Sequence, residues 1–155
     1  MSVQRDLEAE RVGHLDLLPF LAVPIGTRVS EVLARMREQR QNCALITDGD
    51  ARLVGIFTER DVLHKVASRP ESLTLHVEAL MTPDPDTVTP EDRVHDALSF
   101  MNRGHYRHVP VVDRDGRIVG SLRDYAIIRF LSDRLPDTIY NRAPDDQVAK
   151  APEGA

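Results

Sequence analysis

The chain has 155 residues, of which 41% are hydrophobic and 29% are charged, a balance typical of a soluble globular protein rather than a disordered chain. Its formal net charge of −5 argues against broad, sequence-independent binding to nucleic acid, which needs clustered lysine and arginine. The single cysteine, Cys43, excludes a disulfide within the chain and favours a reducing, cytoplasmic location.

The N-terminal region shows no targeting or membrane signal. Residues 1–14 are mixed in charge and lack the apolar stretch of a signal peptide, so we expect an N-terminal extension here. The apolar segment that follows, 15–25, contains Asp16, Pro19 and Pro24. It is too short and too broken to cross a bilayer, so we expect no membrane association.

An internal repeat organises the rest of the sequence. Between residues 28 and 55, nine residues are identical to those found 65 positions later, namely Arg28, Val29, Leu33, Met36, Asp48, Asp50, Arg52, Val54 and Gly55. These identities keep one register without a gap, which indicates a duplication.

Each copy begins with a helical pattern. Apolar residues recur at i, i+3, i+4 and i+7, at Val29, Val32, Leu33 and Met36 and again at Val94, Ala97, Leu98 and Met101. This spacing predicts two amphipathic helices with one buried face each. Thr27 and Asp92 precede them as expected N-caps, and both methionines are expected in the core.

A hairpin and a second helix follow in each copy. Strands are predicted over 43–47 and 52–57 in the first copy, and over 108–112 and 117–122 in the second. Turn-forming aspartates and glycines separate the members of each pair. Second helices are predicted over 59–67 and 125–135, the latter ended by Pro136.

These elements predict an α/β protein built from tandem repeats, each a small sheet packed against two helices and related by a pseudo-two-fold axis. We expect repeat 1 over 15–68, a proline-containing linker and repeat 2 over 69–136, and a polar C-terminal tail, largely disordered, over 137–155. A unit of about 60 residues is marginal alone. We therefore expect the two sheets to pack together and share one larger core.

Two segments in combination resemble a known family. "RLVGIFTERDVL" at 52–63 and "YRHVPVVDRDGRIVG" at 106–120 are similar to the CBS (cystathionine beta-synthase) domain pair, also called a Bateman module. The resemblance covers residues 15–136. It implies two pseudo-symmetric units with AMP, ADP, ATP or S-adenosylmethionine bound in clefts between them.

The threonine and aspartate of the first segment have two interpretations. In the family these positions hold the ribose, which here implies Thr58 and Asp61. A carboxylate accepts from both ribose hydroxyls, and helix N-termini favour a nearby phosphate. The same spacing, however, is that of a capping box that only starts a helix. The two roles are compatible in one residue pair.

The second copy departs from this pattern. Arg123 and Ala126 stand where Thr58 and Asp61 stand in the first copy, and Asp124 is the expected N-cap of the following helix. The second site therefore lacks its ribose carboxylate. We expect it to be empty or to hold something different, with Arg123 either filling the site, reaching an anion or lying in solvent.

The resemblance implies a phosphate site from the second copy. Arg107 and His108 lie at the family's basic positions, with His105 a weaker candidate, whereas the first copy has Asn42 and Cys43 there. A strand-end histidine bonded to backbone is the alternative for His108.

A base site and the absence of other chemistry complete the expectations. By family position the base is expected against Val23, Pro24, Ile25, Cys43 and Ala44. No phosphate-loop or Rossmann glycine motif occurs, and His105 and His108 are poorly spaced on a strand for one metal. We therefore expect no metal, no cofactor and no catalytic residue.

The expected function is a stand-alone regulatory module that binds one adenine nucleotide in repeat 1, senses energy state and signals to an unidentified partner protein. The resemblance also implies a homodimer. The alternative is a structural dimerisation module with vestigial nucleotide pockets. Neither reading implies nucleic acid or membrane as a partner.

Overall fold

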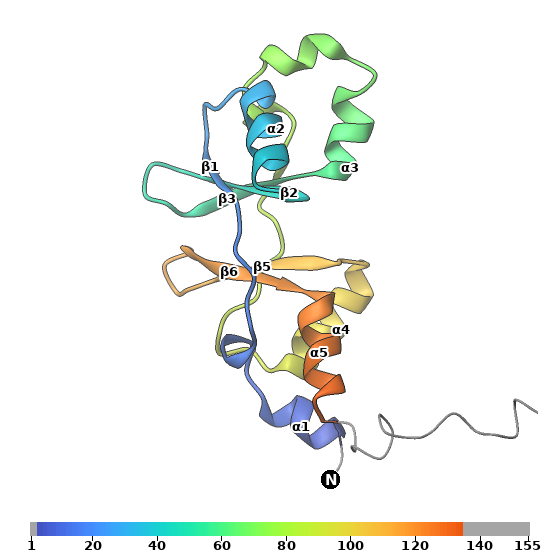
Figure 1. The fold of residues 1–155 in the computed structure, drawn as a ribbon. Helices are drawn as coiled ribbons and strands as arrows, with labels where there is room; N and C mark the ends of the chain where they lie inside the picture. Colours follow the sequence, from blue (N-terminus) through green and yellow to red (C-terminus); the bar gives the residue numbers. More distant parts are fainter. Residues whose placement is uncertain (1–2, 135–155) are drawn as a thin grey trace, which may run out of the picture.

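The molecule consists of two stacked halves whose sheets lie in the middle, with helices on the outer sides (Figure 1). The computed structural model describes residues 3–134. The first half contains β1 (Ala22–Pro24), α2 (Val29–Glu38), β2 (Cys43–Thr47), β3 (Leu53–Thr58), α3 (Glu59–Asp61) and β4 (Thr82–Pro83). The second half contains α4 (Val94–Gly104), β5 (His108–Val112), β6 (Ile118–Arg123) and α5 (Asp124–Ser132), with α1 (Val3–Ala9) packed against α4. The expected α/β class is confirmed.

The two predicted hairpins form the centre of the sheets. The first sheet has the strand order β1-β2-β3-β4, and the second pairs β5 with β6. Leu45 lies opposite Ile56 in one hairpin, and Pro110 lies opposite Ser121 at the equivalent place in the other. Both hairpins also shift register at the same repeat position, after Ile46 and after Val111. β2 and β5 have their predicted bounds, and β3 and β6 begin and end one residue later than predicted.

The starts of α2 and α4 differ from the expected caps. Arg28 and Arg93 are the N-cap residues, and neither makes a side-chain cap hydrogen bond. The Thr27 hydroxyl instead donates to the Pro24 carbonyl at 2.8 Å, and the Asp92 carboxylate accepts from the Thr89 N–H at 2.8 Å. Both predicted N-caps are therefore wrong.

Backbone carbonyls from remote parts of the chain replace the missing caps. The Val29 N–H donates to the Leu75 carbonyl at 2.9 Å, and the Val94 N–H donates to the Glu10 carbonyl at 3.0 Å. Both acceptors lie in segments that reach each helix from elsewhere in the chain. A backbone acceptor satisfies the first free N–H of a helix as well as a side chain does.

Two segments supply these acceptors, and each packs on the half opposite to its place in the chain. Residues 10–17 pack on the second half, and residues 75–81 pack on the first half; we call them the exchanged segments. Val12, in the short 3₁₀ turn Val12–His14, is fully buried in the core of the second half, and its N–H donates to the Asp92 carbonyl at 2.9 Å. Val77, which lies 65 positions later, is fully buried in the first half and donates to the Thr27 carbonyl at 2.8 Å. Much of the predicted linker is thus packed structure, including the 3₁₀ turns Pro70–Thr74 and Val77–Ala79.

Two glycines allow the exchanged segments to cross the hairpins. A Cβ on Gly120 would lie 2.8 Å from the Cβ of Leu17, and a Cβ on Gly55 would meet the side chain of Met81. The glycine that the two repeats share is therefore required by close packing rather than by a positive φ angle. This requirement explains the identity of Gly55 and Gly120.

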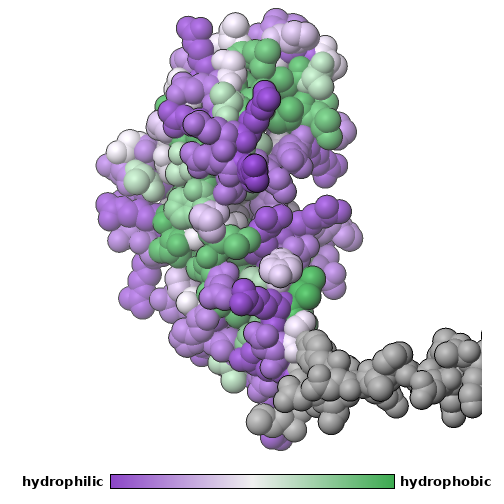
Figure 2. Space-filling model, viewed as in Figure 1, coloured by the Kyte–Doolittle hydropathy of each residue, from purple (hydrophilic) through white to green (hydrophobic). Residues whose placement is uncertain are grey.

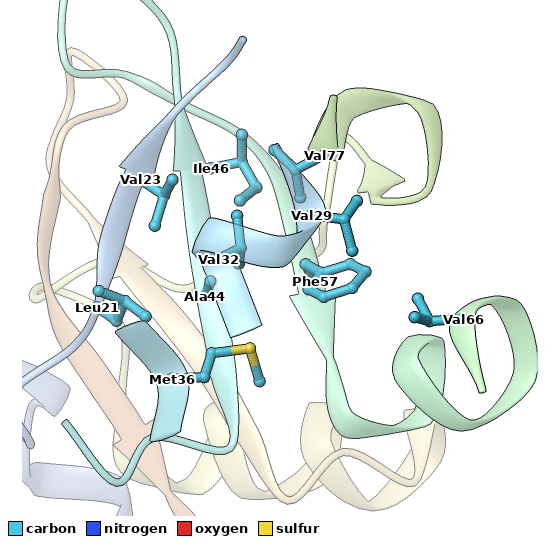
Figure 3. Close-up of a cluster of buried hydrophobic side chains, with 10 residues drawn as sticks. All are labelled: Leu21, Val23, Val29, Val32, Met36, Ala44, Ile46, Phe57, Val66 and Val77. Carbon is cyan, nitrogen blue, oxygen red and sulfur yellow. The ribbon is translucent and has the colours of Figure 1, made fainter. Parts of the chain in front are cut away.

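Each half has its own hydrophobic core rather than the single shared core that we expected. Figure 3 shows the first cluster, in which side chains of α2, β1 and β2 lie together with Phe57 of β3. The second cluster includes Val109, Val111, Leu122 and Ile127. The predicted helix methionines, Met36 and Met101, are buried in their own halves as predicted. The exchanged segments contribute Val77 to the first core and Val12 to the second.

The second helix of each repeat takes a different form. In the first repeat, α3 covers only Glu59–Asp61 and continues as a π-helical turn over Val62–Val66, within the predicted range 59–67. In the second repeat, α5 begins at Asp124, and its N-cap is Arg123 rather than the predicted Asp124. Pro136 and the predicted tail lie outside the described residues.

Candidate functional site

Two clefts lie between the halves. The first cleft has a volume of about 770 Å³. It is lined by Asn42, Ile56, Thr58, Glu59, Arg60, Thr82, Asp84, Pro85, Asp86, His105, Tyr106, Arg107, His108, Val109, Pro110, Arg123 and Asp124. The second cleft has a volume of about 130 Å³ and is lined by Leu18, Pro19, Phe20, Arg40, Gln41, Asn42, Cys43, His108, Ser121 and Arg123. Figure 2 shows a notch between the two halves on the right-hand side, bordered mainly by hydrophilic residues.

The two clefts are the same place in the two repeats. Shifted by 65 positions, the lining residues Ser121 and Arg123 of the second cleft fall on Ile56 and Thr58 of the first. Likewise, Pro19 and Phe20 fall on Asp84 and Pro85, and Arg40, Gln41, Asn42 and Cys43 fall on the run from His105 to His108. Duplication therefore produced two equivalent clefts that now carry different side chains.

Thr58 and Asp61 form a complete capping box at the edge of the first cleft. The Thr58 backbone N–H donates to Asp61 Oδ2 at 3.0 Å, and the Asp61 N–H donates to Thr58 Oγ1 at 3.4 Å. Asp61 Oδ1 also pairs with Lys65 Nζ at 2.9 Å. Asp61 is 7% exposed and does not line the cleft, whereas Thr58 does. The capping interpretation is thus realised, and the ribose role stays a prediction.

The predicted phosphate residues reach the first cleft from the opposite half. Arg107 is exposed, His108 is partly buried, and both line this cleft together with Thr58. Burial, and next the nearby Arg123, lower the pKa of His108 from its ordinary value of 6.5. His108 is therefore neutral at pH 7, and the lining's positive charge comes from arginines, including Arg60 and Arg123.

Tyr106 and Asp86 are lining residues that the sequence reading missed. The Tyr106 hydroxyl donates to Asp86 Oδ2 at 2.5 Å, and this bond is the main reason that the pKa of Tyr106 is raised. The Tyr106 ring packs on Phe100 with centroids 5.6 Å apart. Asp86 lies in the predicted linker, and no local sequence pattern shows that this part of the linker lines the cleft. Tyr106 lies one residue before Arg107 and His108 and belongs to no periodic apolar pattern.

The predicted base-lining residues are not brought to the first cleft. Val23 and Ala44 are fully buried in the first core, because the alternation of β1 and β2 directs them toward α2. Pro24 and Ile25 are exposed and line neither cleft. Cys43 lines the second cleft, where burial raises the pKa of its thiol to about 11. Thr82, Asp84, Pro85 and Asp86 of the predicted linker line the first cleft instead.

The second repeat lacks the carboxylate, as expected. Ala126 is 8% exposed and belongs to the second core. Arg123, which replaces the threonine, lines both clefts. No aspartate or glutamate is found among the described residues that line the second cleft.

Within residues 3–134, no three histidine, cysteine, aspartate or glutamate side chains gather closely enough to hold a metal ion. None of the helices in that range has the length and apolar character needed to cross a bilayer.

Comparison with known proteins identifies the family. The family model of the CBS domain matches residues 12–68 and again 77–133, two stretches offset by the same 65 residues at both ends. The chain therefore belongs to the CBS domain family, and the resemblance seen in the sequence is confirmed.

The curated relatives differ in how much of them this chain spans. An uncharacterized 17.7 kDa protein of Acidianus ambivalens is 31% identical over 120 residues, covering 76% of this chain and 72% of that protein. The CBS domain-containing protein CBSCBSPB5 of Arabidopsis thaliana is 36% identical over 124 residues, covering 79% of this chain and 22% of its own length. The chain thus matches only a part of the longer relatives.

Two similar solved structures contain AMP. A CBS domain protein from Pyrobaculum aerophilum, complexed with AMP, is 31% identical with a TM-score of 0.68, covering 79% of this chain and 98% of that one. CBSX2 in complex with AMP is 26% identical with a TM-score of 0.69, covering 81% of this chain and 98% of that one.

Proposed function

We propose that this protein is a regulatory module that binds one adenine nucleotide in the first cleft and signals its presence to a partner protein. One observation carries the proposal: a cleft of about 770 Å³ brings Thr58 of repeat 1 together with Arg107 and His108 of repeat 2. This volume is in the range of small-ligand pockets, about 300–1,000 Å³. The AMP-bound relatives support the same ligand class.

The phosphate would lie against the arginines of the cleft. Arg107 is an exposed side chain whose planar guanidinium can bind two phosphate oxygens at once. His108 adds a neutral donor rather than a charge, because burial lowers its pKa.

The ribose would share the carboxylate that caps α3. Asp61 Oδ2 accepts from the Thr58 N–H and hydroxyl, and Oδ1 pairs with Lys65. A carboxylate has roughly four acceptor positions, so capacity remains for a ribose hydroxyl. Because Asp61 is nearly buried, its side chain must turn toward the cleft on binding.

The base would pack against the apolar part of the lining. Ile56, Pro85 and the ring of Tyr106 supply this part. Tyr106 is held by Phe100 and by its bond to Asp86, so the surface that it offers is already ordered.

We also propose a homodimer, with apolar helix faces as its contact. Leu63 after α3 is 69% exposed, and Ile128 in α5 is 56% exposed. These residues occupy the same repeat position, 65 apart, so the two halves offer similar patches to a two-fold partner. The role is regulatory rather than catalytic, and the chain acts in the cytoplasm without a cofactor.

A second candidate is a structural dimerisation module with vestigial pockets. The engagement of Asp61 in the capping box and with Lys65, away from the cleft lining, favours it. Thermal shift with AMP, ADP, ATP, S-adenosylmethionine, NAD and cyclic dinucleotides separates the two. A ligand at ten times its dissociation constant stabilises the protein by roughly 1.4 kcal/mol. A flat response to every adenosyl compound would favour the structural module.

A further inference from the structure

The second cleft is lined by positive charge without a balancing acid. Two arginines, Arg40 and Arg123, line it together with neutral polar side chains from Gln41, Asn42 and Ser121. No carboxylate is present among the described residues of this lining. The cleft thus differs from the first, whose lining includes both arginines and acidic residues.

Arg123 is the centre of this charge. Its Nε is buried and has no hydrogen-bond partner within residues 3–134. A buried charged donor without an acceptor is unfavourable, and such groups are normally paired with protein, water or an ion. This unpaired nitrogen indicates that an acceptor is missing from its surroundings.

Neither Cys43 nor His108, which line the second cleft together with Arg123, supplies that acceptor as an anion. Cys43 stays a neutral thiol at pH 7, because burial raises its pKa to about 11. His108 also stays neutral, because burial and the adjacent Arg123 lower its pKa. Glu59 and Asp124 line only the first of the two clefts, and Arg123 Nε has no acceptor within residues 3–134, so this donor is left for a group that enters the second cleft.

The size of the second cleft limits that group to a small one. Its volume of about 130 Å³ is below the usual range for nucleotide-sized ligands, about 300–1,000 Å³, but exceeds the space that one water needs. The missing ribose carboxylate, replaced by Ala126, also argues against a nucleoside. A tetrahedral oxyanion fits both limits, and its oxygens match the fork of donors on a guanidinium.

We propose that the second cleft is a binding site for a small oxyanion of the phosphate or sulfate class, held by Arg123 and Arg40. After the duplication, the motif positions of the second cleft would thus have changed from groups that accept hydrogen bonds from a ligand to an arginine that donates them. This inference does not require that the first cleft bind a nucleotide.

Calorimetric titration of inorganic phosphate into the full chain, at constant ionic strength kept with chloride, tests the proposal. The wild type should bind phosphate saturably. Arg123→Met should weaken the binding about ten- to a hundred-fold, as expected for loss of charge-assisted hydrogen bonds. Absence of saturable binding in the wild type, or unchanged binding in the variant, would overturn the proposal.

Further variants locate the anion and guard against misfolding. Arg40 is exposed and lines only the second of the two clefts, so Arg40→Met should fold normally and also weaken binding. Arg114, an exposed arginine between β5 and β6, lines neither cleft, so Arg114→Met should bind phosphate as the wild type does. Arg107 lines only the first cleft, so loss of binding in Arg107→Met with retention in Arg40→Met would place the anion there and end the proposal.

Discussion

The two clefts occupy equivalent places, yet their motif positions contribute opposite chemistry. Thr58 and Asp61 offer hydroxyl and carboxylate groups, whereas Arg123 and Ala126 offer a cation and a methyl group. The hairpins of the two repeats have hardly diverged, because their pairing and register shift recur at the 65-residue offset, as do bonds of the exchanged segments, whereas the helices that follow differ in form. The fold therefore constrains the backbone and its glycines, and leaves the cleft side chains free to change.

The two repeats differ in how the helix after each hairpin begins. α5 begins at Asp124 after an N-cap residue, Arg123, that makes no side-chain cap bond. The second repeat thus forms its helix without the pair that the first repeat has kept. This independence favours a ligand role for Thr58 and Asp61 beyond helix capping.

The largest expected effect comes from Asp61→Ala. Loss of a hydrogen bond that a ribose hydroxyl donates to a charged carboxylate costs roughly 1.5–3 kcal/mol, so AMP affinity measured by calorimetry should fall about ten- to a hundred-fold. Stability should also fall by roughly 0.5–2 kcal/mol, because the cap is removed.

A control separates these two effects. Lys65→Met removes the ion pair at 2.9 Å but keeps the carboxylate, so it should change stability without a large change in affinity. If Asp61→Ala melts earlier but binds AMP as the wild type does, the pair only starts the helix.

The exchanged segments can be tested at the repeat glycines. Gly120→Ala places a Cβ 2.8 Å from Leu17, and overpacking of this kind should lower the free energy of unfolding by roughly 1–3 kcal/mol in urea denaturation. Gly55→Ala would meet Sδ, Cε and Cγ of Met81, a flexible side chain that can turn aside, so its loss should be smaller. Gly49→Ala is the control, because no other atom lies within 4 Å of its added Cβ. Equal costs at all three positions would contradict the packing argument.

The phosphate assignment is tested by Arg107→Ala. Because the guanidinium is exposed, the loss of AMP affinity should be about ten-fold, with little change for adenosine, and it should shrink as salt rises. Arg114→Ala, an exposed arginine in the β5–β6 turn, should change neither affinity. Similar losses for AMP and adenosine would remove Arg107 from the phosphate site.

The smallest expected effect concerns pH. The pKa of His108 is lower in the folded protein than its ordinary value of 6.5, since burial and Arg123 outweigh Asp124 and Glu59. As pH falls through the interval between these two values, the unfolded chain takes up the proton first, so the folded state loses stability. Urea midpoints between about pH 7 and pH 5 should therefore fall more steeply in the wild type than in His108→Gln. Equal slopes would contradict the burial of this imidazole.

The sequence predicted the fold closely because periodicity and duplication determine local elements. The strands of both hairpins and the buried faces of α2 and α4 followed from apolar spacing. The caps at Thr27 and Asp92 were predicted wrongly, because the acceptors come from residues such as Leu75 that are remote in the chain. Tertiary exchange of segments leaves no local signal.

The candidate site, too, was predicted only in part, because some of its residues come from remote segments. Thr58, Arg107 and His108 were predicted from their motif positions, and the structure brings them to one cleft. Asp86 and Tyr106 were missed, because a polar linker residue and a lone tyrosine have no periodic pattern. The base wall was assigned to residues such as Val23 and Ala44, which the sheets direct into the core.

The assignment of the nucleotide to the first cleft is tested most directly by titrating AMP into the wild type and into Thr58→Arg. This substitution gives the first cleft the residue found at the same place in the second. The variant should fold, because α5 starts after an arginine at the same place. We expect the wild type to bind a single AMP per chain, and we expect Thr58→Arg to show no measurable binding while keeping a cooperative thermal transition. Two equivalent AMP sites in the wild type, or unchanged AMP binding in the folded variant, would contradict the assignment of the nucleotide to the first cleft.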